Sequence, residues 1–166
     1  PRIGFGKEPM PPHNMPMTMI GASLLWAGWF GFNVGSELAA DGVAGAVMIN
    51  TQVATAAAVL GWLLIESLQK GKASMLGGAS GAIAGLVAIT PACAVVGPMG
   101  AIILGFVASL VAYWACTSLK KVIGYDDSLD VFGIHGVAGI IGAIGLAILM
   151  SPTFGGVGFD EGVSMA

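Results

Sequence analysis

The chain has 166 residues, of which 56% are apolar and only 9% are charged, and its formal net charge is −3. Soluble domains carry about 25% charged residues and expose a large share of their surface at this size, so the composition argues against a water-soluble fold. Six basic residues are too few for binding a polyanion such as nucleic acid. We therefore expect an all-α bundle of membrane-spanning helices.

Five apolar stretches have roughly the 20 residues that a helix needs to cross a hydrocarbon core of about 30 Å. In chain order they are residues 17–36, 43–65, 74–92, 97–119 and 130–150. The links between them are short. We predict five spans within a single transmembrane domain that occupies residues 1–166.

The segment before the first span starts with Pro1-Arg2 and has no initiator Met, so we expect the chain to be part of a longer protein. His13 follows two prolines and precedes Asn14. Proline fixes a turn, and asparagine is a favoured helix N-cap. We interpret His13 as structural and Asn14 as the cap of the first helix.

The first span ends in an aromatic run, Trp26-Ala-Gly-Trp-Phe-Gly-Phe-Asn33, and Ser36 follows it. One interpretation is an aromatic belt at the membrane surface, which composition alone favours. The other is a cation site, because aromatic faces attract a desolvated ammonium-like ion. In that case the Ser36 hydroxyl would accept a hydrogen bond from the ion.

Glycine recurs at intervals of three or four residues in the third and fifth spans, at Gly77, Gly81, Gly85, Gly136, Gly139 and Gly142. Small residues at such intervals let membrane helices approach closely. Close packing is the simpler interpretation, and the wall of a narrow pore is the alternative.

The two cysteines, Cys93 and Cys116, fall at opposite ends of the fourth predicted span. A helix of that length separates them by about 30 Å, which is too far for a disulfide. We predict two free thiols. With two histidines and no Cys-x-x-Cys, the sequence predicts neither a metal site nor a cofactor.

The last span follows Asp126, Asp127 and Asp130, which we interpret as caps because carboxylates bind the free N–H groups at a helix start. His135 is the ionisable side chain within that span. An imidazole at this depth is costly unless it faces a cavity or a polar partner, so we predict a functional residue. The alternative is a structural histidine bonded to a backbone carbonyl.

The basic residues indicate the orientation, because cytoplasmic loops retain Lys and Arg. All six fall in the first, third and fifth links, as Arg2, Lys7, Lys70, Lys72, Lys120 and Lys121. The second and last links carry acidic residues instead, Glu37, Asp41, Asp160 and Glu161. We expect an integral protein of the cell (inner) membrane with its residue 1 end in the cytoplasm.

Five motifs along the chain resemble those of the ammonium transporter family (Amt/MEP/Rh), and the Gly-Ile-His-Gly context resembles its Amt branch. They are Pro11-Pro-His-Asn-Met-Pro16, Gly28-Trp-Phe-Gly-Phe-Asn33, Gly81-Ala-Ile-Ala-Gly-Leu-Val87 with Thr90-Pro-Ala-Cys93, Asp130-Val-Phe-Gly-Ile-His-Gly136 and Gly155-Gly-Val-Gly-Phe159. The resemblance implies a trimeric transporter with eleven spans in two inverted halves. This chain is similar to the second half, helices six to ten.

The resemblance also implies roles for single residues. Phe32 would be one of two stacked phenylalanines that gate the outer pore, and Ser36 the hydroxyl of the outer ammonium site. His135 would be the second of two histidines at mid-pore. The remaining matches are pore-wall positions, at Ile83, Thr90 and Val131. The first pore histidine, the other gating phenylalanine and the outer-site tryptophan belong to the half that this chain lacks.

The implied activity is ammonium uptake and not an enzymatic reaction: ammonium binds outside, loses a proton, and ammonia passes His135. An ammonium sensor on the same scaffold, signalling to another domain, and a passive gas or water channel stay open as alternatives. The implied partners are ammonium, membrane lipid, two further copies of the chain and a cytoplasmic PII-type regulator. That regulator would approach the face with Lys70, Lys72, Lys120 and Lys121.

Overall fold

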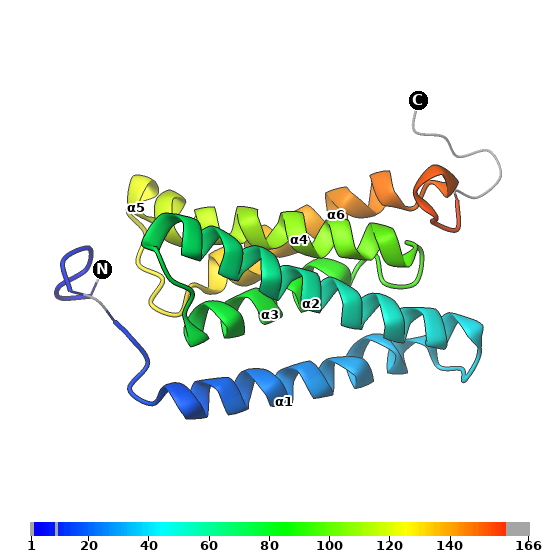
Figure 1. Ribbon diagram of the computed structural model, residues 1–166, viewed down its shortest axis with the longest axis horizontal. Helices are drawn as coiled ribbons and strands as arrows, with labels where there is room; N and C mark the ends of the chain where they lie inside the picture. The colour runs from blue at the N-terminus through cyan, green and yellow to red at the C-terminus, as the bar shows by residue number, and fades with distance from the viewer. Residues whose placement is uncertain (1, 9, 159–166) are drawn as a thin grey trace.

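The computed structural model describes residues 2–8 and 10–158, and within them five long helical segments run back and forth along one direction (Figure 1). Their bounds are α1 (Met15–Asn33), α2 (Gly42–Lys70), α3 (Met75–Ile89), α4 (Pro98–Trp114) and α6 (Ala138–Leu149). A π-helical segment, η2 (Ala115–Leu119), and α5 (Lys120–Ile123) extend α4, and a second π-helical segment, η3 (Phe132–Val137), leads into α6. Short 3₁₀ turns, η1 (Gly35–Glu37) and η4 (Pro152–Phe154), follow α1 and α6.

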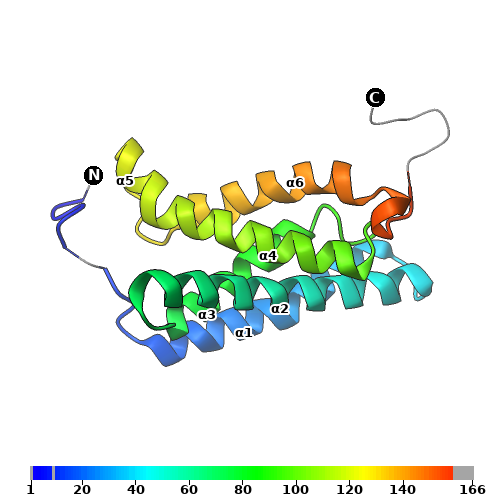
Figure 2. The same cartoon turned by 45° about the horizontal axis from the view of Figure 1, so that its top comes forward.

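Successive helices run in opposite directions, so their ends gather at two ends of the bundle (Figures 1 and 2). The start of α1, the link from α2 to α3, and α5 share one end with the N-terminal segment. All the described basic residues belong to these parts of the chain. We call this the basic end. The acidic pair Asp160 and Glu161 and the last motif residue, Phe159, lie outside the described residues.

Within the described residues, three helices are long and apolar enough to cross a membrane: Gly42–Lys70, Pro98–Ile123 and Phe132–Leu149. Of the other two predicted spans, α3 is a shorter apolar helix of 15 residues, and α1 has 19 residues but is not among these three. The third span was predicted to end at residue 92, which is too late, because α3 stops at Ile89. Pro91 has no N–H to continue the helical hydrogen bonds. The second is too short, since α2 continues to Lys70 and ends at Gly71 in the left-handed conformation.

The third helix, α3, lies at the centre of the bundle and packs on α1, α2, α4 and α6. Glycine makes this packing possible. A Cβ at Gly85 would lie 2.5 Å from the Ala58 Cβ, and one at Gly142 would lie 2.2 Å from the Ala88 carbonyl oxygen. The close-packing interpretation therefore holds for Gly77, Gly81, Gly85 and Gly142. It does not hold for Gly136, where the nearest atoms belong to Phe132 of the same helical segment, or for Gly139, where the nearest atom would be 3.7 Å away.

A buried carboxylate fixes the turn between α2 and α3. Glu66 is 5% exposed, and its oxygens accept hydrogen bonds from the Ser74 backbone N–H and hydroxyl at 3.0 Å. Lys70 forms an ion pair with it at 3.2 Å. Ser74 in turn caps α3 by accepting from the Gly77 N–H. The expected cap of α1 is confirmed as well, since the Asn14 side chain accepts from the Met17 N–H at 3.0 Å.

Both cysteines are free thiols and buried, as predicted. Cys93 lies in the segment between α3 and α4, and Cys116 lies in η2.

Candidate functional site

The aromatic residues of the first predicted span lie at the end of α1 that is opposite to the basic end. Phe32 is exposed, and its ring contacts Trp29 edge-to-face with the centroids 5.7 Å apart. Ser36 is exposed in η1, and its hydroxyl donates to the Phe32 carbonyl. The hydroxyl proton is therefore used within the chain, while the oxygen lone pairs remain available to accept a hydrogen bond from a ligand.

A polar network lies directly behind these residues and joins three helices. The Trp29 indole N–H donates to the Thr90 hydroxyl at 2.9 Å, and the Asn33 amide donates to the Thr51 hydroxyl at 3.1 Å. The Thr90 oxygen lies 2.8 Å from the Leu86 carbonyl and 3.3 Å from the Asn33 amide oxygen. Its single proton can serve only one of them at a time, and the Leu86 carbonyl is closer. The network therefore fixes the end of α1 on α2 and α3.

Sequence reasoning missed Asn33 and Thr51. Asn33 is 5% exposed and Thr51 is fully buried. For Asn33 the sequence did offer a signal: an amide side chain follows directly after an aromatic run, and a polar group in such an apolar helix needs a hydrogen-bond partner when it is buried.

Replacing Thr90 by valine is expected to destabilise the protein, because the half-buried Trp29 indole loses its acceptor. An unpaired buried donor costs about 1–3 kcal/mol. Thr90→Ser keeps the hydroxyl and is the matched control. Thermal unfolding of the purified full-length protein should give a lower midpoint for the valine variant than for the serine variant, and equal midpoints would contradict the assigned bond.

The predicted functional histidine lies near the other end of the bundle. His135 is exposed in η3 and lines a pocket of about 630 Å³, together with Val131 and an aromatic pair. The pair is Tyr125 and Phe132, which contact edge-to-face with their centroids 5.4 Å apart. The structure therefore places Val131 and His135 at one pocket.

The three aspartates that precede this segment have different roles. The Asp127 carboxylate accepts from the Val131 and Phe132 N–H groups at 3.0 and 2.8 Å, so it is the predicted cap. Asp126 and Asp130 are not caps: they form ion pairs with Arg2 and Lys120. The reason is tertiary, because the N-terminal segment and α5 bring these two cations to the aspartates. Asp130 also takes a left-handed backbone conformation, with φ +56°.

Burial, with a contribution from the Asp127 carboxylate, raises the pKa of the Tyr125 phenol above its ordinary value. The phenol therefore stays protonated at neutral pH. The pocket that His135 lines is therefore also lined by a neutral phenol and by Asp126 and Asp127.

The predicted residues other than Ile83 thus form two groups. Phe32, Ser36 and Thr90 lie where α1 ends, opposite to the basic end, and Val131 and His135 line the pocket near the basic end. Ile83 is 8% exposed within the core. Both α1 and η3 pack on α3, which connects the two groups.

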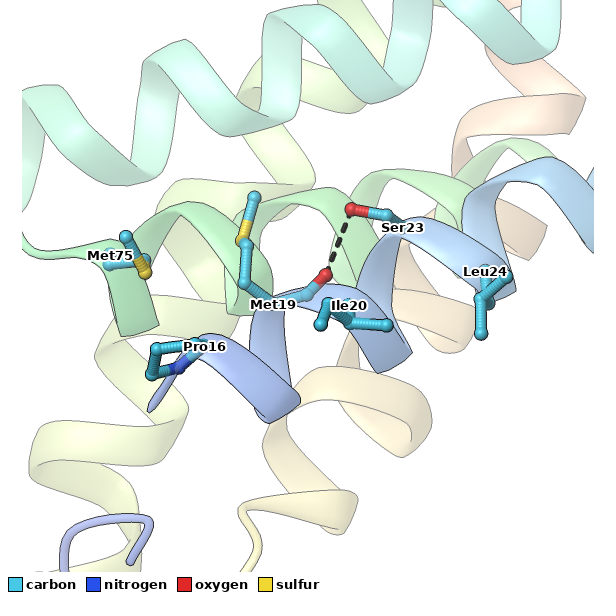
Figure 3. A pocket seen from close by; sticks show the side chains of 6 residues that line it. All are labelled: Pro16, Met19, Ile20, Ser23, Leu24 and Met75. Carbon is cyan, nitrogen blue, oxygen red and sulfur yellow. Dashed lines mark hydrogen bonds between the residues drawn. The ribbon is translucent and has the colours of Figure 1, made fainter. Parts of the chain in front are cut away.

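A second hollow, of about 460 Å³, lies on α1 and α3 (Figure 3). Pro16, Met19, Ile20, Ser23, Leu24 and Met75 line it. The Ser23 hydroxyl donates to the Met19 carbonyl within its own helix at 2.8 Å, so this hollow presents an almost wholly apolar surface. It contains none of the predicted site residues.

Antiparallel helices, three of them long and apolar enough to cross a membrane among the described residues, indicate a polytopic integral membrane protein, and the imidazole on one of them indicates a functional site. The sequence model of the Ammonium Transporter Family matches residues 1–164. The chain belongs to that family, whose members are transporters and not enzymes.

The relatives are full-length ammonium transporters. One from Bacillus subtilis is 50% identical over 149 residues, which cover 90% of this chain and 37% of the relative. One from Mycobacterium tuberculosis is 50% identical over 163 residues, 98% of this chain and 34% of the relative. The chain therefore spans little more than a third of the length of these relatives.

Solved structures agree with the fold. Mep2 from Saccharomyces cerevisiae matches with a TM-score of 0.78 and 36% identity, over 87% of this chain and 35% of Mep2. A Sensor Amt Protein matches with a TM-score of 0.80 and 33% identity, over 86% of this chain and 35% of that protein.

Proposed function

We propose that the full-length protein transports ammonium across the membrane and that this chain is the second of its two inverted halves, helices six to ten. The observation that carries the proposal is the 50% identity with ammonium transporters over 90% of the chain. The positions of the site residues also support the proposal. The aromatic residues at the end of α1 and His135 lie toward opposite ends of the bundle, as an entry site and a later point on a transport route would.

Ammonium first binds at the outer end of α1. The rings of Phe32 and Trp29 attract a desolvated cation with about 0.5–2 kcal/mol. The Ser36 hydroxyl donates its proton to the Phe32 carbonyl, so its oxygen accepts an N–H of the ion. Together these groups replace part of the water shell of the ion. The network at Asn33 and Thr90 holds them in place.

The ion then loses a proton, because the segment beyond is too apolar for a charge. Ile83 and its neighbours in α3 belong to a core of aliphatic and small side chains. Neutral ammonia passes along this route to His135, whose imidazole donates and accepts hydrogen bonds. Potassium has no proton to lose and is rejected.

The exposure of the site residues supports a pore wall that the other half of the protein completes. Phe32, Val131 and His135 are all exposed in this chain. An imidazole on a membrane helix is costly against lipid, so a facing protein segment or a water-filled cavity is required. Residues from the missing half would supply that surface and the remaining groups of the outer site.

The proposed assembly is a homotrimer in which each subunit has its own pore, with residue 1 on the cytoplasmic side. A PII-type regulator would approach the basic end. Lys70, Lys72 and Lys121 are exposed there, whereas Lys120 is less available because it pairs with Asp130.

Replacing His135 by alanine in the full-length protein is the direct test. Methylammonium uptake and potassium flux would be measured in proteoliposomes that contain equal amounts of folded protein. We expect uptake to fall or potassium to become permeant, because the route loses its hydrogen-bonding group. His13→Ala is the matched control, since His13 lies exposed before α1 and should change neither flux. Unchanged uptake together with unchanged potassium exclusion would remove His135 from the mechanism.

The second candidate function is that of an ammonium sensor, which the likeness to the Sensor Amt Protein favours. In a sensor, ammonium binding would change the state of an attached domain. The same proteoliposomes distinguish the two functions: ammonium binding without uptake supports the sensor, and uptake that saturates with ammonium supports the transporter.

A further inference from the structure

Two π-helical segments face each other beside the histidine. One is η2, which continues α4, and the other is η3, which contains His135. The two segments are in contact. π-Helical turns are rare, occur mostly as single turns, and are frequent at functional sites. One extra residue in a helical turn rotates every later side chain about the helix axis by about 100°. The π-helical turn of η3 therefore determines which way the later residues of this helix point.

The contact between the two segments is made at a glycine. Gly133 is buried, and a Cβ there would lie 2.4 Å from the Cys116 sulfur and 3.2 Å from the Cys116 backbone nitrogen. Cys116 is 8% exposed and belongs to the same core as Ile134. The sulfur could move only by changing its rotamer inside this core, and the backbone nitrogen cannot move without the helix. A side chain at position 133 would therefore have to displace the Cys116 sulfur or push η3 away from η2.

The imidazole has no comparable restraint of its own. The described hydrogen bonds around the start of η3 involve Asp127, Asp130 and Lys120, and none of them reaches His135. Asp127 fixes the start of η3 at Val131 and Phe132, and the contact of Gly133 with Cys116 fixes the next residue. The direction of the His135 side chain is therefore set by the backbone of η3.

We propose that Gly133, seated against Cys116, is a positioning residue for His135. The contact between the two π-helical segments sets the rotation and depth at which the imidazole enters the pore. The inference rests on the proposed function, in which His135 meets the transported ammonia. It adds that Cys116 in η2, on a neighbouring helix, takes part in selectivity although its buried side chain does not meet the cargo.

The test is a rescue experiment in the full-length protein. Gly133→Ala should lower methylammonium uptake or raise potassium permeation by about tenfold to a hundredfold, since displacements of about 1 Å have effects of this size in enzyme sites. Cys116→Gly alone removes the sulfur contact but pushes nothing aside, so it should change the flux ratio less than Gly133→Ala does. The double variant should recover most of the loss, because the added methyl group then occupies the space of the sulfur. Gly139→Ala is the matched control on the same helical run, where a Cβ meets nothing closer than 3.7 Å.

Selectivity is the decisive measurement, because lost packing alone lowers the amount of folded protein without changing the ratio of methylammonium to potassium flux. If Gly133→Ala does not accumulate, Cys116→Val tests the same contact from the other side and should shift the ratio in the same direction. A folded Gly133→Ala protein with wild-type fluxes would overturn the inference. So would a loss that Cys116→Gly fails to relieve.

The result for His135→Ala separates this inference from its premise. If that variant is impaired and Gly133→Ala is normal, the positioning role fails and the transport mechanism stands. If His135→Ala is itself normal in both fluxes, the mechanism fails and the positioning role falls with it.

Discussion

Replacing Gly142 by alanine is expected to reduce the yield of folded protein sharply and to lower its unfolding temperature. The added Cβ would lie 2.2 Å from the Ala88 carbonyl oxygen, 2.9 Å from the Ala88 carbonyl carbon and 3.0 Å from its Cα. All three atoms belong to the backbone of α3, so none can rotate away. The two helices would have to separate along their shared interface.

The energies involved favour a net loss of stability in Gly142→Ala. Overpacking of a tight core costs about 1–3 kcal/mol and occasionally more. The higher helix propensity of alanine returns at most about 1 kcal/mol. A membrane interface that consists of close backbone contacts has little else to hold it, because no hydrophobic force drives helices together in lipid.

Gly139→Ala is the matched control, since Gly139 lies three residues earlier in the same helix and its added Cβ would make only an ordinary contact with Val87. We would compare the yield of monodisperse full-length protein in detergent and its thermal midpoint for the two variants. Equal values would show that α6 does not pack on α3 as closely as described.

Asn50→Leu is expected to have a second large effect on stability. Asn50 is 1% exposed in α2, and its amide donates to the Cys93 carbonyl at 2.9 Å and to the Val96 carbonyl at 2.7 Å. These bonds close the irregular segment between α3 and α4. Irregular backbone is tolerated at membrane depth only where other groups satisfy it. Leucine has a similar size but cannot donate.

The loss leaves two buried carbonyls unpaired, each at a cost of about 1–3 kcal/mol. Asn50→Asp keeps the shape but replaces the amide NH2 by an oxygen that carries at most one proton, so at least one of the two carbonyls loses its donor and this variant should also be less stable than the wild type. Gln52→Leu is the control, because Gln52 is exposed on the same helix two residues away. Thermal unfolding of the full-length variants checks the order. An Asn50→Leu protein as stable as the wild type would show that the amide does not stabilise the segment between α3 and α4.

Local features of the chain were predictable from the sequence. The five apolar stretches correspond to the five long helical segments, because a helix of apolar residues satisfies its own backbone and needs no partner to be recognised. The same holds for the Asn14 and Asp127 caps, which bond to N–H groups three to five residues away. His135 was identifiable because its chemistry is unusual for its surroundings.

Contacts between distant parts of the chain were not predictable. Trp29 and Thr90 are 61 residues apart, and Arg2 and Asp126 are 124 apart. Nothing in their local sequence indicates that they meet. For this reason all three aspartates before the last span were interpreted as caps, although only Asp127 is one. Gly139 and Gly142 likewise look equivalent in the sequence, and only the position of α3 distinguishes them.

The sequence by itself determined that this is a helical membrane chain, where its helices begin and end to within a few residues, and which histidine carries the function we propose. The tertiary structure alone decided which polar groups hold the aromatic residues at the end of α1 and which glycines lie against a neighbouring helix. It also revealed the two π-helical segments that we propose set the direction of His135. The physical reason is that hydropathy and capping act over one or two helical turns, whereas register and close approach depend on the helices that pack against one another.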